Sequence, residues 1–213
     1  MIKAILITIL ILLLTWSVHL TRVERLSETV RARAMEYYRA HQDTIGNNRY
    51  LTVIDFTRPS YARRMHILDL ETDQTERFLV AHGESSGYVY ATELSDRIGS
   101  HQSCRGFFLT GEAYQGDYGP ALKLHGLEQG VNENAFRRDI VLHGATWASY
   151  GSILENGGRL GRSWGCPAVP LSAVDRIVEQ LQDGSLMYIH GFDEIVRRPR
   201  CPNTVAESNC SRL

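Results

Sequence analysis

The sequence lacks any strong excess of charge of one sign. Its 213 residues carry 23 Lys and Arg against 24 Asp and Glu, which gives a formal net charge of −1. Nucleic-acid-binding domains usually carry a clear basic patch or stripe, so the composition argues against nucleic acid as a partner. No internal repeat is visible. The roughly 190 residues beyond the N-terminus suffice for one domain with a sizeable core.

Long apolar runs are also scarce, and the one that stands out is at the N-terminus. Met1 and Lys3 precede a run over residues 5–14, followed by Thr15-Trp16-Ser17. This pattern is typical of a secretory signal peptide, or of an uncleaved membrane anchor over residues 4–20. A poor cleavage site and a helical pattern from residue 21 onward favour the anchor. The positive charges after the run oppose it; they are Arg22, Arg25, Arg31 and Arg33. Both alternatives predict a periplasmic or cell-envelope location.

Cysteine is scarce too, with four in the chain. In an exported protein four cysteines would normally suggest two disulfides. Cys201 and Cys210 lie in a tail rich in Pro, Asn and Ser, and a loop closed between them would stabilise the fold by roughly 2–3 kcal/mol. Cys104 and Cys166 would then be left over, and a working nucleophile at Cys166 must stay unpaired. The sequence leaves the pairing open.

The patterning predicts four segments. Residues 1–21 are the signal peptide or anchor, and 22–48 form a helical spacer, either packed on the domain or lifting it from a membrane. Residues 49–192 form the main domain, and 193–213 a C-terminal tail. Short segments rich in branched residues predict strands; they cover 51–56, 64–70, 77–82, 106–110, 121–127, 140–143 and 186–190. Helices are expected over 22–45, 132–138 and 172–182. The fold class is therefore mainly β with few short helices.

Two residues carry the chemistry expected of the domain. Cys166 lies in Gly161-Arg162-Ser163-Trp164-Gly165-Cys166-Pro167, and His143 closes the apolar run 140–142. A nearby imidazole can take the proton of a thiol, and the thiolate is the nucleophile. Amide N–H groups around Gly165 and Cys166 could hold an oxyanion. No Asp or Glu lies at an obvious spacing from His143, so the carbonyl of Gly144 is the expected group that orients its ring.

His143-Gly144 and the Gly161–Ala168 stretch resemble the active-site signature of the L,D-transpeptidases, cysteine enzymes that cross-link bacterial peptidoglycan. The resemblance is closer to a murein L,D-transpeptidase subgroup. Further motifs that match it are Val80-Ala81-His82-Gly83-Glu84-Ser85-Ser86-Gly87, Gly99-Ser100-His101-Gln102-Ser103-Cys104-Arg105-Gly106 and Leu124-His125-Gly126-Leu127. The resemblance implies a sandwich-like domain, Cys166 as nucleophile, His143 as base and the Gly144 carbonyl as orienting group. It also implies peptidoglycan stem peptides as substrate, with no metal or organic cofactor.

The sequence departs from the broad family at two points beside the cysteine. Trp164 stands where a second histidine is common, and Pro167-Ala168 where a polar residue is frequent. Trp164 is expected either to stack on substrate or to pack the loop. Arg162 either binds a stem-peptide carboxylate or is a solvated loop charge. The other residues expected to contact substrate are Ser163, Gly165, His125 and His82.

The expected activity is formation of 3→3 peptidoglycan cross-links through a cysteine thioester. Water as acceptor would instead make the protein an L,D-carboxypeptidase. A catalytically silent wall-binding module is a third reading, with Cys166 buried or oxidised. A fourth is a zinc hydrolase that uses His82, His125 and His143, although none of the histidines shows the i, i+4 pairing of helical zinc motifs.

Overall fold

A computed structural model describes residues 2–192. Cys201, Cys210 and the expected tail over 193–213 lie outside the described residues. Within 2–192, eight strands form one sheet in the order β3-β2-β1-β8-β4-β5-β6-β7. The strands are β1 (Asn47–Asp55), β2 (Met65–Asp69), β3 (Gln74–Phe78), β4 (Gly106–Gly116), β5 (Gly119–Gly126), β6 (Val141–Ala145), β7 (Ala168–Pro170) and β8 (Ser185–His190). Neighbours run antiparallel except β1–β8 and β6–β7, which are parallel.

Few helices accompany the sheet. They are α1 (Ile2–Val23), α2 (Glu28–Ala40), α3 (Tyr150–Glu155) and α4 (Val174–Leu181), with short 3-10 helices η1 (Gln42–Thr44), η2 (Glu84–Ser86) and η3 (Phe136–Arg138). The mainly β, sandwich-like class expected from the sequence is therefore confirmed. The segment 132–138, expected to be a helix, forms only η3. The strand expected over 77–82 ends at Phe78, and α3 and β7 have no counterpart in the sequence-based prediction.

The two faces of the sheet bury separate apolar clusters. Along β1, Leu51 and Val53 face α2, whereas Ile54 joins the cluster around α4. This alternation is the period-2 pattern of a strand covered on both sides. The α4 cluster draws buried side chains from β1, β2, β4, β5, β6, β7 and β8, so the sheet bends around it. A register shift in β4 between Thr110 and Ala113 is a bulge of the kind that bends strands.

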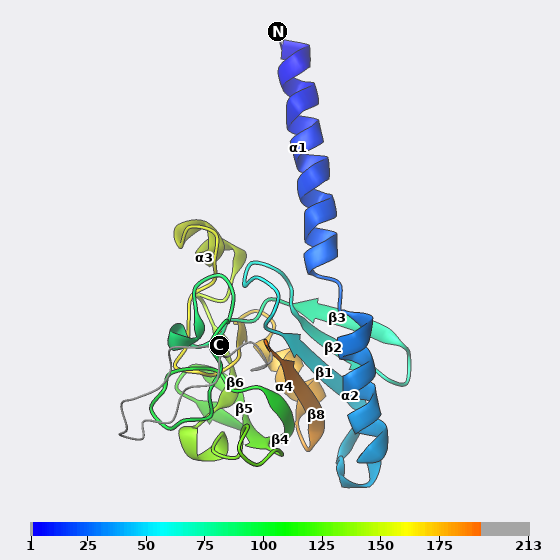
Figure 1. Cartoon of the computed structure of the whole chain (residues 1–213), viewed down its shortest axis with the longest axis vertical. Coiled ribbons are helices and arrows are strands. Elements are labelled where there is room, and N and C mark those ends of the chain that lie inside the picture. Colours follow the sequence, from blue (N-terminus) through cyan, green and yellow to red (C-terminus); the bar gives the residue numbers. More distant parts are fainter. Residues whose placement is uncertain (1, 193–213) are drawn as a thin grey trace, which may run out of the picture.

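α1 and α2 differ in how they meet the domain. α2 lies against the sheet, with Val30, Ala34 and Tyr38 buried, whereas α1 has no buried residue and projects away from the domain (Figure 1). The single helix expected over 22–45 is thus wrong, because the chain leaves helical geometry after Val23 and α2 restarts after an extended Ser27. Of the two alternatives for this segment, the structure supports a helix packed on the domain.

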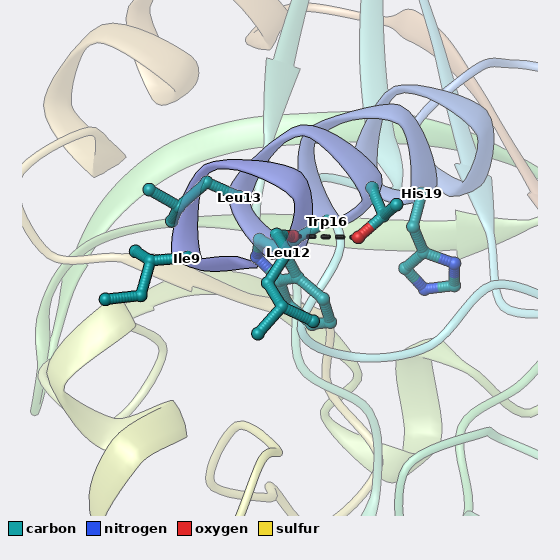
Figure 2. A pocket seen from close by; sticks show the side chains of 6 residues that line it. Ile9, Leu12, Leu13, Trp16 and His19 are labelled. Carbon is teal, nitrogen blue, oxygen red and sulfur yellow. Dashed lines mark hydrogen bonds between the residues drawn. The ribbon is translucent and has the colours of Figure 1, made fainter. Parts of the chain in front are cut away.

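α1 is the one helix of the described chain that is long and apolar enough to cross a membrane by length and composition. A shallow hollow on its side is lined by Ile9, Leu12, Leu13, Thr15, Trp16 and His19 (Figure 2). A hydrogen bond from Thr15 Oγ1 to the Leu12 carbonyl lies within it. This hollow belongs to the surface of the projecting helix and contains none of the residues expected to carry chemistry.

Candidate active site

Cys166 lies at the end of the loop that leads into β7, with its side chain half-buried. Its sulfur accepts a hydrogen bond from the Val141 amide at 3.4 Å, and its thiol contacts the Asp139 carbonyl at 3.4 Å. Burial raises the pKa of the thiol, while the Val141 amide and the positive charge of Arg138 act in the opposite direction. The sulfur is therefore held against the start of β6, the strand that carries His143.

His143 lies in the middle of β6, between β5 and β7. Its amide donates to the Pro167 carbonyl at 3.4 Å, and it pairs with Ala168 of β7, two residues beyond Cys166. Its Nδ1 lies 3.0 Å from the Gly144 carbonyl. Because a carbonyl can only accept, Nδ1 carries the proton and Nε2 keeps its lone pair. Burial lowers the pKa of the ring, the Gly144 contact opposes this, and the net effect favours the neutral imidazole that a base requires.

Aromatic side chains that the sequence analysis did not single out surround this pair. The ring of Tyr118 lies 5.7 Å from that of His143, and the ring of Trp147 lies edge-on at 6.2 Å. Tyr114 pairs with Ala121 of β5, which in turn pairs with His143 of β6. Burial raises the pKa of Tyr114, and the charge of a Cys166 thiolate adds to that effect. Tyr114 lies near the end of β4 and Tyr118 in the β4–β5 turn, and no local motif links them to a histidine one strand farther on.

The loop before Cys166 is braced from inside by two serines. Ser163 Oγ donates to the Cys166 carbonyl at 2.6 Å and accepts from the Gly165 amide at 3.1 Å. Ser103 Oγ donates to the Gly165 carbonyl at 2.9 Å and accepts from the Gly83 amide at 2.9 Å. Ser163 is 7% exposed and its hydroxyl bonds backbone groups of its own loop, so its expected contact with substrate stays a prediction. Since the Gly165 amide is engaged, the Cys166 amide is the remaining candidate of that pair for an oxyanion donor.

Gly165 occupies a conformation that favours glycine, with φ +125°. A Cβ at this position would stand 2.8 Å from the Gln102 carbonyl oxygen. Gly165 therefore contributes a close approach of two loops, which any side chain would prevent.

The segment around His82 supports the same loop from the other side. Ala81 exchanges backbone hydrogen bonds with Ala168 at 2.8 and 3.4 Å, and the Ser163 amide donates to the His82 carbonyl at 3.1 Å. The His82 side chain is 1% exposed. Its Nδ1 accepts from Arg64 at 2.7 Å and its Nε2 faces the Gly87 carbonyl at 3.3 Å. The His82 ring is thus buried with both nitrogens in contacts within the protein, and its expected contact with substrate stays a prediction.

The remaining expected contact residues lie at the surface. Trp164 is 73% exposed and stacks on His101, with ring centroids 5.0 Å apart. Arg162 Nη1 donates to the carbonyls of Glu84 and Gly87 at 2.8 and 3.2 Å. The Arg162 guanidinium also lies 4.8 Å from the ring centroid of the exposed Tyr88. Arg162 therefore braces the loop, whereas the Trp164 side chain is exposed on the surface two residues before Cys166.

The histidines of the zinc alternative do not converge. His125 stacks on Phe136 at 4.9 Å, His82 is buried with both nitrogens engaged, and His143 contacts Gly144. In the part of the chain that the structure describes, no group of three His, Cys, Asp or Glu side chains is placed to hold a metal ion.

A family model described as "L,D-transpeptidase catalytic domain" matches residues 22–190. No curated protein sequence matches the chain.

Solved structures that resemble the chain include an L,D-transpeptidase from Mycobacterium smegmatis, at 12% identity and TM-score 0.41, covering 67% of this chain and 59% of that one. The helical cell shape determining protein from Campylobacter jejuni aligns at 14% identity and TM-score 0.45, covering 79% and 58%. An L,D-transpeptidase from Xylanimonas cellulosilytica aligns at 14% identity and TM-score 0.39, covering 72% and 69%. The alignment thus spans less than two thirds of the length of the first two.

Proposed function

The chain belongs to the L,D-transpeptidase catalytic domain family, and we propose that it forms 3→3 peptidoglycan cross-links with Cys166 as nucleophile. The family supports a cell-wall transpeptidase-type activity on peptidoglycan stem peptides. The observation that carries the assignment of residues is the β6–β7 pairing, which sets His143 beside the Pro167–Ala168 backbone while the sulfur of Cys166 contacts the same strand. The contact of His143 Nδ1 with the Gly144 carbonyl leaves Nε2 as the atom that accepts a proton.

In the first half of the proposed reaction, Nε2 of His143 takes the proton of the Cys166 thiol. The thiolate attacks the carbonyl carbon that joins the L-centre of the diamino acid to D-alanine. The C–N bond then breaks, the imidazolium returns the proton to the departing D-alanine amine, and a thioester remains on Cys166. The Cys166 amide is the candidate donor to the oxyanion of the tetrahedral intermediate.

In the second half, the side-chain amine of a neighbouring stem attacks the thioester carbonyl. His143 accepts a proton from that amine and delivers it to the leaving sulfur, which restores the thiol and completes the cross-link. Water in place of the amine would release a tripeptide and make the enzyme an L,D-carboxypeptidase. The acceptor alone distinguishes the two activities, because all protein groups are shared.

The test is mass spectrometry of muropeptides from cells that express the wild type, Cys166→Ala or Cys104→Ser. The proposal expects 3→3 dimers with the wild type and with Cys104→Ser, whose hydroxyl can replace the buried thiol as an acceptor, and no such dimers with Cys166→Ala. Loss of tripeptides without any change in dimers would identify a carboxypeptidase. Products independent of Cys166 would refute a cysteine enzyme and favour a wall-binding module.

We also propose that α1 is a retained membrane anchor and that the domain works on the outer side of the inner membrane. Supporting contacts join the base of α1 to the domain. His19 Nε2 lies 3.0 Å from Tyr61 Oη, and Glu24, directly after α1, receives hydrogen bonds from the Arg63 amide and guanidinium at 2.7–3.1 Å. Cleavage near residue 17 to 21 would remove the first of these contacts.

A further inference from the structure

Arg138 is a buried cation that the proposed reaction does not use. It ends η3, and its side chain is 3% exposed. Nη1 donates to the Ser95 carbonyl at 2.7 Å and to Cys104 Sγ at 2.8 Å. Nη2 donates to Ser100 Oγ at 3.1 Å and to the Gln102 carbonyl at 2.5 Å. Four hydrogen bonds thus fix the guanidinium beneath the segment 95–104.

The counter-charge of Arg138 lies on one side of it only. The nearest carboxylate oxygen, Asp96 Oδ1, is 3.8 Å from Nη1. The same carboxylate is held by the Asn134 amide at 2.8 Å and by its side chain at 3.0 Å. The thiol between them does not cancel the cation, because burial raises the pKa of Cys104 to about 12 and keeps it neutral. The Nη1 side of the guanidinium therefore faces an anion.

The Nη2 side of the guanidinium faces the loop of the nucleophile. A Cβ added to Gly165 would lie 3.2 Å from Nη2, so this nitrogen lies beside the residue that precedes Cys166. The Arg138–Asp96 pair is thus a buried dipole whose positive end points at the cysteine loop. In a poorly solvated interior such a fixed charge acts over several ångströms with little screening.

The other groups that face Cys166 do not provide this positive charge. Asp139 contacts the sulfur through its carbonyl, and its carboxylate opposes a thiolate. The phenol of Tyr114 and the thiol of Cys104 have raised pKa values and stay neutral near pH 7. His143 is neutral before it accepts the proton of the thiol, since burial lowers its pKa. Arg138 is therefore the permanent cation in this environment.

We propose that Arg138 is a positioning residue whose buried positive charge stabilises the thiolate of Cys166, with the Asp96 carboxylate on the opposite side of the guanidinium. Its hydrogen bonds also hold the segment 100–104 beneath Gly165. The proposal rests on the proposed function only in taking Cys166 as the nucleophile. It assigns to η3 an electrostatic role that a neutral side chain of the same shape could not fill.

The test measures the rate of alkylation of Cys166 by iodoacetamide against pH in the full-length protein. Mass spectrometry of the Cys166 peptide separates it from the other cysteines. Arg138→Met removes the charge and should raise the midpoint of the profile by about one pH unit, which is roughly tenfold slower alkylation below the midpoint. Arg138→Lys keeps the charge, so the midpoint should stay close to that of the wild type. Asp96→Asn removes the opposing anion and should lower it.

Opposite shifts in Arg138→Met and Asp96→Asn would support the proposal, because a purely structural role would not move the midpoint in two directions. An unchanged midpoint in a folded Arg138→Met, verified by circular dichroism, would overturn it. If Arg138→Met does not fold, Asp96→Asn decides alone, and an unchanged or raised midpoint rejects the electrostatic role. The measurement needs no peptidoglycan, so its failure is separate from failure of the muropeptide test.

Discussion

At the scale of single residues, buried serine hydroxyls hold the loop before Cys166. Ser103 connects the Gly83 amide to the Gly165 carbonyl, two segments far apart in the sequence. Ser163 closes the same loop on itself. The position of Ser163 beside the cysteine motif suggested a substrate contact, but a serine side chain is short enough to bond backbone groups of its own loop. The sequence shows the serine and not the direction in which it points.

We expect Ser103→Ala to lower the free energy of unfolding by about 1–3 kcal/mol, because a buried amide and a buried carbonyl lose their partner. The rate of alkylation of Cys166 should also differ from that of the wild type, because the loop relaxes. Urea denaturation checks the first effect and iodoacetamide labelling the second. The matched control is Ser172→Ala, at an exposed serine, which should change stability by less than about 0.5 kcal/mol. Equal effects of the two substitutions would contradict the bracing role.

Two buried imidazoles predict how stability depends on pH. Burial, followed by the charge of Arg64, lowers the pKa of His82 to about 3, and burial followed by Arg77 lowers that of His66 to about 4. The unfolded chain binds these protons near pH 6.5, so their contribution is complete above pH 6.5 and is lost as the pH falls toward 4. The titration of each imidazole should lower the free energy of unfolding by about 2 kcal/mol between pH 7 and pH 5.

Urea denaturation at pH 7 and pH 5 measures this loss. His82→Gln keeps an acceptor for Arg64 and removes one of these titrations, so the difference in free energy of unfolding between the two pH values should shrink by about 2 kcal/mol. A wild-type protein equally stable at both pH values would show that these rings are protonated without cost in the folded state.

At the scale of elements, α1 and α2 have different roles although they adjoin in the sequence. The periodic pattern over 22–45 predicted one helix, since helical periodicity does not reveal where tertiary contacts interrupt it. Glu24 is 4% exposed and turns inward to Arg63, which ends helical geometry between the two elements. α2 then covers the face of the sheet formed by β1 and β8.

Two alanines of α2 provide a matched test of this packing. Ala34 is fully buried against the sheet, and Ala32 is exposed on the same helix. Ala34→Gln should lower the free energy of unfolding by about 2–3 kcal/mol because it overfills the interface with a polar side chain. Ala32→Gln should have an effect within about 0.5 kcal/mol. Thermal and urea denaturation followed by circular dichroism compare the pair, and equal losses would argue against α2 as a packed element.

At the scale of the whole molecule, local patterns predicted the class of fold, and they singled out a histidine of β6 and a cysteine whose sulfur contacts Val141 of the same strand. The strand segments and the His143 and Cys166 motifs are readable because each lies within a few residues of chain. The residues that support the cysteine loop cannot be predicted from local patterns. Arg138 reaches Gln102 across 36 positions and Ser103 reaches Gly165 across 62. Such pairs become neighbours only through the order of strands in the sheet, which no local pattern encodes.

The proposed anchor makes a prediction about the intact protein. If α1 is retained, the protein purified from membranes should have the mass of the full chain and should need detergent for release. A signal peptide would yield a soluble protein shorter by the N-terminal segment. Intact-mass spectrometry of the membrane and soluble fractions distinguishes the two, and a protein lacking residues 1–21 in the soluble fraction would refute the anchor.

The joint between α1 and the domain also limits how far the enzyme could reach. Glu24 is fixed by Arg63 directly after α1, and α2 is packed on the sheet, so no slack chain separates the helix from the domain. With α1 in a bilayer, the working distance of Cys166 would be bounded by the girth of the domain itself, roughly 40 Å for about 170 residues. An enzyme held this close to the membrane would reach only the stem peptides nearest the membrane, however thick the cell wall is.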